Sequence, residues 1–411
     1  MIDSIILKKQ IIFLTFAIVL FLTNCKTMDN GEQEESDAEA YSIPPELPIP
    51  ERLIELGEKY REEGDNLKAL DCFNAAIKIN PSYAPAYTYR GLFYIRTKAY
   101  TEALKDLGEA VKLTPYPNPR SREDVMAYIF YGLCHYELGN YEQAIPVFTK
   151  TVEKNPYYAD AYNFRGLAYS KLGQYEQALE EYTLAIHFGK IVKGAQDVYY
   201  LNRGCIYGVL KDYKKAIDDF TKSIEFKADS AEVYVERGNA YNFLEKYDKA
   251  LEDFTHALIL KSNLMTAYLG CGMVYFNMGK YEESVAAFTK AEEINPSVYA
   301  YGGRGSALIY LLKHEAAVND FNRALKLKPM DGSLYKMRGV AYLNWGKYQE
   351  AIHDFDESVK LNPNDLETRQ GREEAYRALH SIMEGYTFIL PPSKLHAEMS
   401  IQNQRIANPD R

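Results

Sequence analysis

One glycine recurs along the chain at intervals of about 34 residues, nine times between residues 57 and 339. In chain order these glycines are Gly57, Gly91, Gly132, Gly166, Gly204, Gly238, Gly272, Gly305 and Gly339. We number nine repeats in this order and place the glycine at position 8 of each. Position 20 is then Ala or Ser throughout, and position 24 is Phe except for Leu107 and Tyr182. Self-similarity at such a period predicts a stack of small structural units rather than one catalytic globule.

Each repeat is expected to form two helices joined by a turn. Glycine inside a helix costs roughly 0.5–1 kcal/mol relative to alanine, so its recurrence indicates that the two helices approach closely there, against the small residue at position 20. A short glycine-containing turn, such as Leu172-Gly173-Gln174, separates the helices. Proline is poorly tolerated inside helices, and it ends the second helix of six repeats at Pro81, Pro115, Pro156, Pro296, Pro329 and Pro363.

This spacing of Gly, Tyr, Ala, Phe and Pro resembles the tetratricopeptide repeat, and the resemblance extends over residues 50–365. It implies an all-α fold, a right-handed superhelical solenoid of about nine helical hairpins. Residues 366–385 keep helical character without a partner hairpin, so we expect them to form a capping helix. Residues 386–411 are expected to be an irregular tail.

Charges at positions 7 and 23 vary together. Three repeats are uncharged at both positions, with Leu56 and Cys72, Tyr131 and Val147, or Cys271 and Ala287. An antiparallel hairpin that turns near position 15 brings the two positions opposite each other. The pattern therefore predicts ion pairs that set the register of the two helices; the alternative is a ladder of arginines that binds an anion. The six predicted pairs are Arg90–Asp106, Arg165–Glu181, Arg203–Asp219, Arg237–Asp253, Arg304–Asp320 and Arg338–Asp354.

The first residues have the pattern of an export signal. Lys8 and Lys9 precede an apolar stretch, residues 11–22, that is too short to span a membrane. Residues 22–25, Leu-Thr-Asn-Cys, resemble the lipidation motif of bacterial lipoproteins, although Asn24 stands where a smaller residue is usual. We expect residues 1–24 to be a lipoprotein signal peptide and Cys25 to be lipidated, with an uncleaved anchor or plain secretion as alternatives. Residues 25–49, rich in acidic residues and proline, are expected to be a disordered tether.

The sequence offers little for catalysis. It has no recognisable catalytic motif and its seven histidines are dispersed, so we expect no enzyme, metal site, cofactor or small-molecule substrate. The formal net charge of −9 argues against a nucleic-acid partner. His135 stands where most repeats have a core tyrosine and is expected to be a core histidine with satisfied hydrogen bonds. The cysteines beyond Cys25 are expected to be small buried hydrophobes: Cys72, Cys134, Cys205 and Cys271.

In arrays of the family, positions 2, 5, 9, 12 and 13 of the first helices line a concave groove. No repeat here has Lys at position 5 followed by Asn at position 9, the pair with which chaperone-binding members hold a carboxylate. A peptide laid along the groove fits the mixed surface better, whereas the competing interpretation is that these side chains pack between repeats. The candidates for partner binding are Asn163, Asn239, Asn242, Phe243, Phe276, Asn277, Tyr299, Tyr310, Lys336 and Asn344.

These features together predict a membrane-tethered scaffold that binds a protein or peptide partner in its groove. The lipid anchor would place it in a bacterial cell envelope, on the periplasmic face or the outer surface, with a role in envelope assembly or secretion. The alternative function is a surface-exposed lipoprotein adhesin that binds host or environmental ligands.

Overall fold

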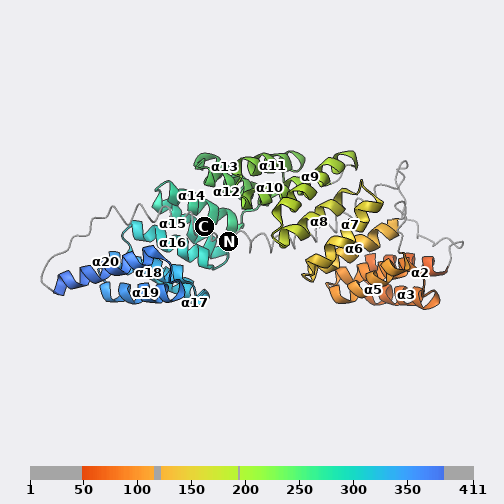
Figure 1. The fold of residues 1–411 in the computed structure, drawn as a ribbon, viewed down its shortest axis with the longest axis horizontal. Coiled ribbons are helices and arrows are strands. Elements are labelled where there is room, and N and C mark those ends of the chain that lie inside the picture. Colours follow the sequence, from red (N-terminus) through yellow and green to blue (C-terminus); the bar gives the residue numbers. More distant parts are fainter. Residues whose placement is uncertain (1–48, 115–121, 193–194, 384–411) are drawn as a thin grey trace. The chain divides into compact units, whose positions relative to one another are not determined.

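The computed structural model describes residues 49–114, 122–192 and 195–383, which fold into the helices α2 to α20 (Figure 1). Nine helix pairs, one for each repeat, are followed by the single helix α20 (Leu366–Met383). The prediction of an all-α repeat fold is confirmed for these residues. The predicted signal peptide, Cys25, almost all of the tether and the tail from residue 386 lie outside the described residues.

The two helices of each pair have similar lengths from repeat to repeat. The first helices are α2 (Ile49–Glu62), α4 (Ala84–Arg96), α6 (Arg122–Glu137), α8 (Ala159–Lys171), α10 (Gln196–Val209), α12 (Ala231–Phe243), α14 (Met265–Asn277), α16 (Val298–Tyr310) and α18 (Gly332–Asn344). The second helices are α3 (Asn66–Ile79), α5 (Tyr100–Leu113), α7 (Tyr141–Lys154), α9 (Tyr175–Val192), α11 (Tyr213–Phe226), α13 (Tyr247–Leu260), α15 (Tyr281–Ile294), α17 (His314–Leu327) and α19 (Tyr348–Leu361).

Prolines and left-handed turn residues end the helices. Each of the six predicted prolines lies two residues beyond the last residue of a second helix. Between the two helices of a hairpin, one residue has a positive φ, a conformation that glycine adopts without steric cost. Glycine holds this place in five hairpins, at Gly64, Gly139, Gly173, Gly279 and Gly346, and a residue with a side chain holds it in the other four, at Lys98, Lys211, Glu245 and Leu312.

The repeated glycine at position 8 makes room for an aromatic ring. In repeat 5, a Cβ added to Gly204 would lie 2.8 Å from the ring of Phe220, which is the residue at position 24. Position 20 also lies close to position 8. In repeat 7, the Ser284 hydroxyl donates to the carbonyl oxygen of Gly272 at 2.8 Å. The sequence-based expectation named only the small residue at position 20. The side chain at position 24, a ring such as Phe220 or the Leu107 side chain in repeat 2, is the group that excludes a side chain at position 8.

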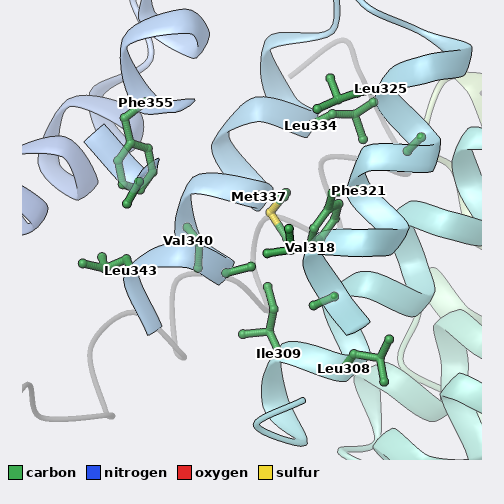
Figure 2. Close-up of a cluster of buried hydrophobic side chains, with 14 of the residues drawn as sticks. Leu308, Ile309, Val318, Phe321, Leu325, Leu334, Met337, Val340, Leu343 and Phe355 are labelled. Carbon is green, nitrogen blue, oxygen red and sulfur yellow. The ribbon is translucent and has the colours of Figure 1, made fainter. Parts of the chain in front are cut away.

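The same ring also contacts the next repeat. Gly303, at position 6 of repeat 8, lies against the ring of Phe288 from repeat 7, which also contacts Gly272 of its own hairpin. Figure 2 shows how the buried side chains of helices α16 to α19, among them Phe321 and Met337, form one continuous cluster across two repeats. The ring of Phe288 is therefore shared between the hairpin that carries it and the hairpin that follows, and Phe355 contacts Gly339 and Gly371 in the same way.

The described residues divide into two compact units, an amino-terminal unit that ends at Ala240 and a carboxy-terminal unit that begins at Tyr241. In each unit the first helices of neighbouring repeats contact each other, as α2 with α4 and α14 with α16. Helices α2, α4, α6, α8 and α10 therefore form one layer in the amino-terminal unit, and α14, α16, α18 and α20 form one in the carboxy-terminal unit. We call the face of these helices at positions 2, 5, 9, 12 and 13 the inner surface. Among the described residues, no helix has both the length and the apolar character needed to cross a membrane.

Candidate functional site

Four of the six position-7 arginines bind a carboxylate of their own hairpin through two nitrogens of the guanidinium, Nε and Nη2. In repeat 5, Arg203 donates from Nε and Nη2 to the two carboxylate oxygens of Asp219, each at 2.8 Å. The same two-armed contact, at 2.6–2.8 Å, joins Arg90 to Asp106, Arg304 to Asp320 and Arg338 to Asp354. These carboxylates are buried. The arrangement is a planar, bidentate pair, which fixes geometry as well as charge.

A third contact of each arginine reaches the preceding repeat, and the sequence analysis missed it. Nη1 of Arg203 donates to the hydroxyl of Thr183 at 3.1 Å, which is position 25 of repeat 4. The corresponding contacts are Arg90 to Asn74, Arg165 to Thr149, Arg237 to Thr221, Arg304 to Thr289 and Arg338 to Asn322, at 2.5–3.1 Å. One guanidinium thus fixes the register within a hairpin and links it to its neighbour. Groups engaged in this way are poorly suited to bind an external anion.

Repeat 4 forms a weaker version of the pair. Glu181 replaces the usual Asp, and Nη2 of Arg165 contacts its Oε1 at 2.8 Å. Nε of Arg165 and Oε2 of Glu181 are buried and have no hydrogen-bond partner. Burial raises the pKa of Glu181 in spite of the opposing attraction of Arg165. For the sixth predicted pair, the structure gives the contact of Arg237 with Thr221, and the pairing of Arg237 with Asp253 stays a prediction.

Three of the predicted partner-binding residues are buried and serve the packing of the array, which corrects the prediction that they face a partner. Asn163, Phe276 and Lys336 are 3%, 6% and 7% exposed. Asn163 accepts a hydrogen bond from Nδ2 of Asn202 in the next repeat at 2.8 Å. The other seven, Asn239, Asn242, Phe243, Asn277, Tyr299, Tyr310 and Asn344, lie on first helices and are half-buried. Their role in partner binding stays a prediction.

Neighbouring repeats bring several of these side chains together in the carboxy-terminal unit. Nδ2 of Asn277 donates to Oδ1 of Asn242 at 3.1 Å. The rings of Tyr281 and Tyr310 stack with centroids 4.5 Å apart, and the edge or face of Phe276 contacts both. Burial raises the pKa of Tyr310 well above its ordinary value. Half-buried amides and tyrosine rings therefore gather around the buried ring of Phe276, and such groups suit recognition rather than proton transfer.

The described residues hold no arrangement that points to catalysis. They contain no cluster of three or more His, Cys, Asp or Glu side chains that fits a metal ion. Burial raises the pKa of the Cys271 thiol to about 11, which keeps it protonated and unreactive at neutral pH. His135 corrects an expectation, because its Nδ1 is buried without a hydrogen-bond partner. Its ring packs edge-on against Tyr131, with centroids 4.7 Å apart.

The fold defines a class of protein, the stacked arrays of helical hairpins. The tetratricopeptide repeat family matches residues 54–118, 122–190, 198–230, 231–263, 266–297, 298–330 and 333–365. The chain belongs to this family. Tetratricopeptide repeats form protein-interaction scaffolds, and such scaffolds are generally non-enzymatic.

The chain is also similar to parts of several known proteins. Human serine/threonine-protein phosphatase 5 is 29% identical over 137 residues, which make up 33% of this chain and 26% of the phosphatase. The crystal structure of the APC/C hetero-tetramer Cut9-Hcn1 superposes with a TM-score of 0.51 at 16% identity, over 80% of this chain and 62% of the other. The structure of pilF from Pseudomonas aeruginosa gives a TM-score of 0.45 at 15% identity, over 53% and 94%. The chain thus spans about a quarter of the phosphatase and under two thirds of the matched APC/C chain.

Proposed function

We propose that this chain is a membrane-tethered scaffold that holds a protein or peptide partner on the inner surface of its repeats, in the assembly or secretion machinery of a bacterial cell envelope. The observation that supports this most is that its polar side chains fall into two groups, one used in packing and one left partly exposed. The position-7 arginines of the five observed pairs are engaged in packing, whereas half-buried amides and aromatic rings remain along the first helices.

The membrane tether is proposed from the sequence. The motif that ends at Cys25 and the export-type residues before it support lipidation, and the acidic, proline-rich residues 25–49 would hold the array at a distance from the bilayer. We expect Cys25→Ser to move the protein into the soluble fraction, or to leave the signal uncleaved, without any change in the stability of the repeats. Fractionation of cells followed by mass spectrometry of the amino terminus measures both. Membrane attachment with a processed signal in this variant would refute the lipid anchor.

The partner is best identified in the intact envelope. Crosslinking of whole cells, followed by purification of the full chain and mass spectrometry, is expected to recover a defined envelope protein. Asn277→Asp, which adds a charge to the inner surface, should reduce the yield of that protein. Equal recovery with the variant would show that the captured protein binds elsewhere.

The alternative function is an adhesin displayed on the outer surface, which the same lipid anchor permits. Digestion of intact cells with a protease separates the two functions. A scaffold on the periplasmic face survives until the outer membrane is permeabilised, whereas a displayed adhesin is cut from intact cells.

A further inference from the structure

The two edges of repeats 1 to 4, which lie in the amino-terminal unit, expose different side chains. Because the helices of a hairpin are antiparallel, the first helix begins and the second helix ends at one edge, and the turn lies at the other. We call these the junction edge and the turn edge. Each is taken as the four residues of every helix that begin or end there, together with the connecting residues that the structure describes.

The junction edge exposes one large apolar side chain at its start and one after each of the four repeats. These five residues are 38–60% exposed, whereas the turn edge has two such residues, Leu67 and Leu138. The five are Ile49, Ile79, Leu113, Tyr157 and Ile191. Exposed apolar side chains that recur along one edge indicate a contact with an apolar or amphipathic partner.

The charges of the two edges also differ. Among the described residues, the exposed charged side chains of the junction edge are basic except for one, in the set Arg52, Lys78, Lys112, Glu153, Lys154 and Lys190. The turn edge exposes more acids than bases, in the set Lys59, Glu62, Glu63, Lys68, Arg96, Lys98, Glu102, Glu142 and Glu176. Lys112 contacts Glu109 of its own helix at 2.6 Å, so the junction edge keeps a moderate positive excess.

Basic and apolar side chains are adjacent on the junction edge. Three second helices end in the pairs Lys78-Ile79 and Lys112-Leu113 or, one residue before the end, Lys190-Ile191. A lysine in the last turn of a helix interacts favourably with the helix dipole. The dipole does not account for the exposed apolar residue beside each lysine. A surface that offers both an apolar interior and anionic groups would satisfy the two side chains together.

The proposed tether joins the array at the junction edge, where α2 begins at Ile49. As a flexible chain, the expected tether of about 24 residues would have a root-mean-square length of roughly 25–30 Å, although its full extension is ~80 Å. The turn edge is farther from this attachment point by the length of a helix. A lipid anchor at Cys25 would therefore raise the effective concentration of the junction edge at the bilayer.

We infer that the junction edge of repeats 1 to 4 binds the anionic surface of the lipid bilayer to which the chain is anchored. The apolar side chains enter the boundary between headgroups and acyl chains, and the lysines contact the phosphates. Apolar burial combined with attraction to anionic lipids is the physical basis of such binding. The inference rests on the proposed membrane tether, and it concerns a surface other than the inner surface.

A fluorophore placed at either end of α3 tests the inference on the full, anchored chain. Ile79→Cys labels the junction edge and Leu67→Cys, its matched control, labels the turn edge about 18 Å away along the helix. The two native side chains are 53% and 79% exposed, so neither substitution should unfold the array, and thermal unfolding checks this. The unsubstituted chain reports any labelling of Cys205.

The vesicles contain phosphatidylethanolamine and phosphatidylglycerol, with or without nitroxide groups on the acyl chains. We expect the label at residue 79 to lose most of its fluorescence when the nitroxide is present, and the label at residue 67 to keep it. Replacing phosphatidylglycerol with phosphatidylcholine should restore the fluorescence at residue 79. The same recovery is expected for the triple variant Lys78→Gln, Lys154→Gln and Lys190→Gln, but not for the turn-edge triple Lys59→Gln, Lys68→Gln and Lys98→Gln.

The possible failures of the inference and of the proposed function are distinguishable. If the wild type does not remain on the vesicles, the membrane tether fails together with the inference. If the chain remains but the label at residue 79 is not quenched, or is quenched no more than the label at residue 67, the junction edge does not bind the bilayer and the tether stands. Quenching at residue 79 that ignores both the lipid charge and the lysine variants would contradict an anionic partner.

Discussion

Replacing Glu181 with Asp is expected to stabilise repeat 4. In the four other observed pairs the carboxylate at position 23 comes from Asp and receives both Nε and Nη2 of its arginine. The longer Glu181 leaves Nε of Arg165 and one of its own oxygens buried without partners. Glu181→Asp removes one methylene and should allow the two-armed contact.

The size of the effect follows from two opposing contributions. An unsatisfied buried polar group costs about 1–3 kcal/mol, and Glu181→Asp should satisfy two of them. The removed methylene loses about 0.8 kcal/mol of burial, and small adjustments of the helices offset part of the gain. We therefore expect the local free energy of unfolding to rise by at least about 1 kcal/mol, which is a factor of roughly 5 or more in the ratio of closed to open forms.

The gain should depend on pH. Burial raises the pKa of Glu181 above its ordinary value of 4.5, so the fold favours the protonated carboxyl. For an acid of this kind, stability is fully present below the pKa of the unfolded chain and is lost as pH rises through the pKa of the folded state. The wild type therefore bears its penalty at neutral pH. The advantage of Glu181→Asp should be greatest near pH 7 and shrink as pH falls to about 4.

Native-state hydrogen exchange tests this prediction because it measures the free energy of opening of each repeat separately. A local measurement is needed because repeat arrays unfold in parts. Protection of the amides in α8 and α9 should increase in Glu181→Asp, whereas repeats 1 and 9 should be unchanged. The mirror variant Asp219→Glu in repeat 5 should lose about 1–3 kcal/mol, because an extra methylene overpacks the pair and breaks the two-armed contact. If Glu181→Asp gains nothing and Asp219→Glu loses nothing, the two-armed geometry does not contribute to stability.

Three further predictions concern single positions. Gly204→Leu should lower the free energy of unfolding by about 3 kcal/mol, because the new side chain overpacks against Phe220. Hydrogen exchange should be accelerated in repeat 5 and its neighbours, and uniform acceleration from residue 50 to 380 would contradict an array whose repeats respond locally. Leu312→Gly should stabilise the turn of repeat 8 by about 1 kcal/mol, since Leu312 is 72% exposed and has a φ of 56°, and an unchanged melting temperature would argue against strain there. Burial lowers the pKa of His135, so the wild type should lose stability as pH falls below about 6.5. The loss in His135→Tyr should be smaller when unfolding is followed from pH 8 to pH 5, because only His314, whose pKa is also lowered by burial, then contributes in this way.

The period and the residue types were sufficient to predict the hairpins. Each glycine, alanine or proline of the pattern indicates either the end of one helix or one close approach between helices. Both features lie within a single hairpin, between residues that are near in sequence. The observed ion pairs could be predicted for the same reason, because positions 7 and 23 are related by the turn of a single hairpin. Arg203 and Asp219 needed no knowledge of how one repeat sits on the next.

Contacts between repeats depend on the rotation from one hairpin to the next, and a period alone does not determine that rotation. Asn163 and Lys336 were therefore assigned to a partner, whereas they are buried against Asn202 and against the start of α20. The contact of each arginine with the preceding repeat had a signal in the sequence. Position 25 is Thr or Asn before every repeat that has Arg at position 7, and it is Gly108 before Tyr131. Thr255 before Cys271 breaks this rule, so the signal is incomplete.

The end of the array shows which residues are needed for contacts between repeats and which for contacts within one hairpin. Helix α20 occupies the place of a first helix after repeat 9, with Gly371 at position 6 and Arg372 at position 7. Gly371 lies against the ring of Phe355, and Nη1 of Arg372 lies 3.0 Å from Oδ1 of Asp356, as in the joints between complete repeats. At position 8, however, the residue is Glu373, which is exposed. No second helix follows α20 within the described residues, so no ring requires a glycine there. Gly371 and Arg372 therefore serve the joint with the preceding repeat, whereas the glycine at position 8 is present only where a repeat closes its own hairpin.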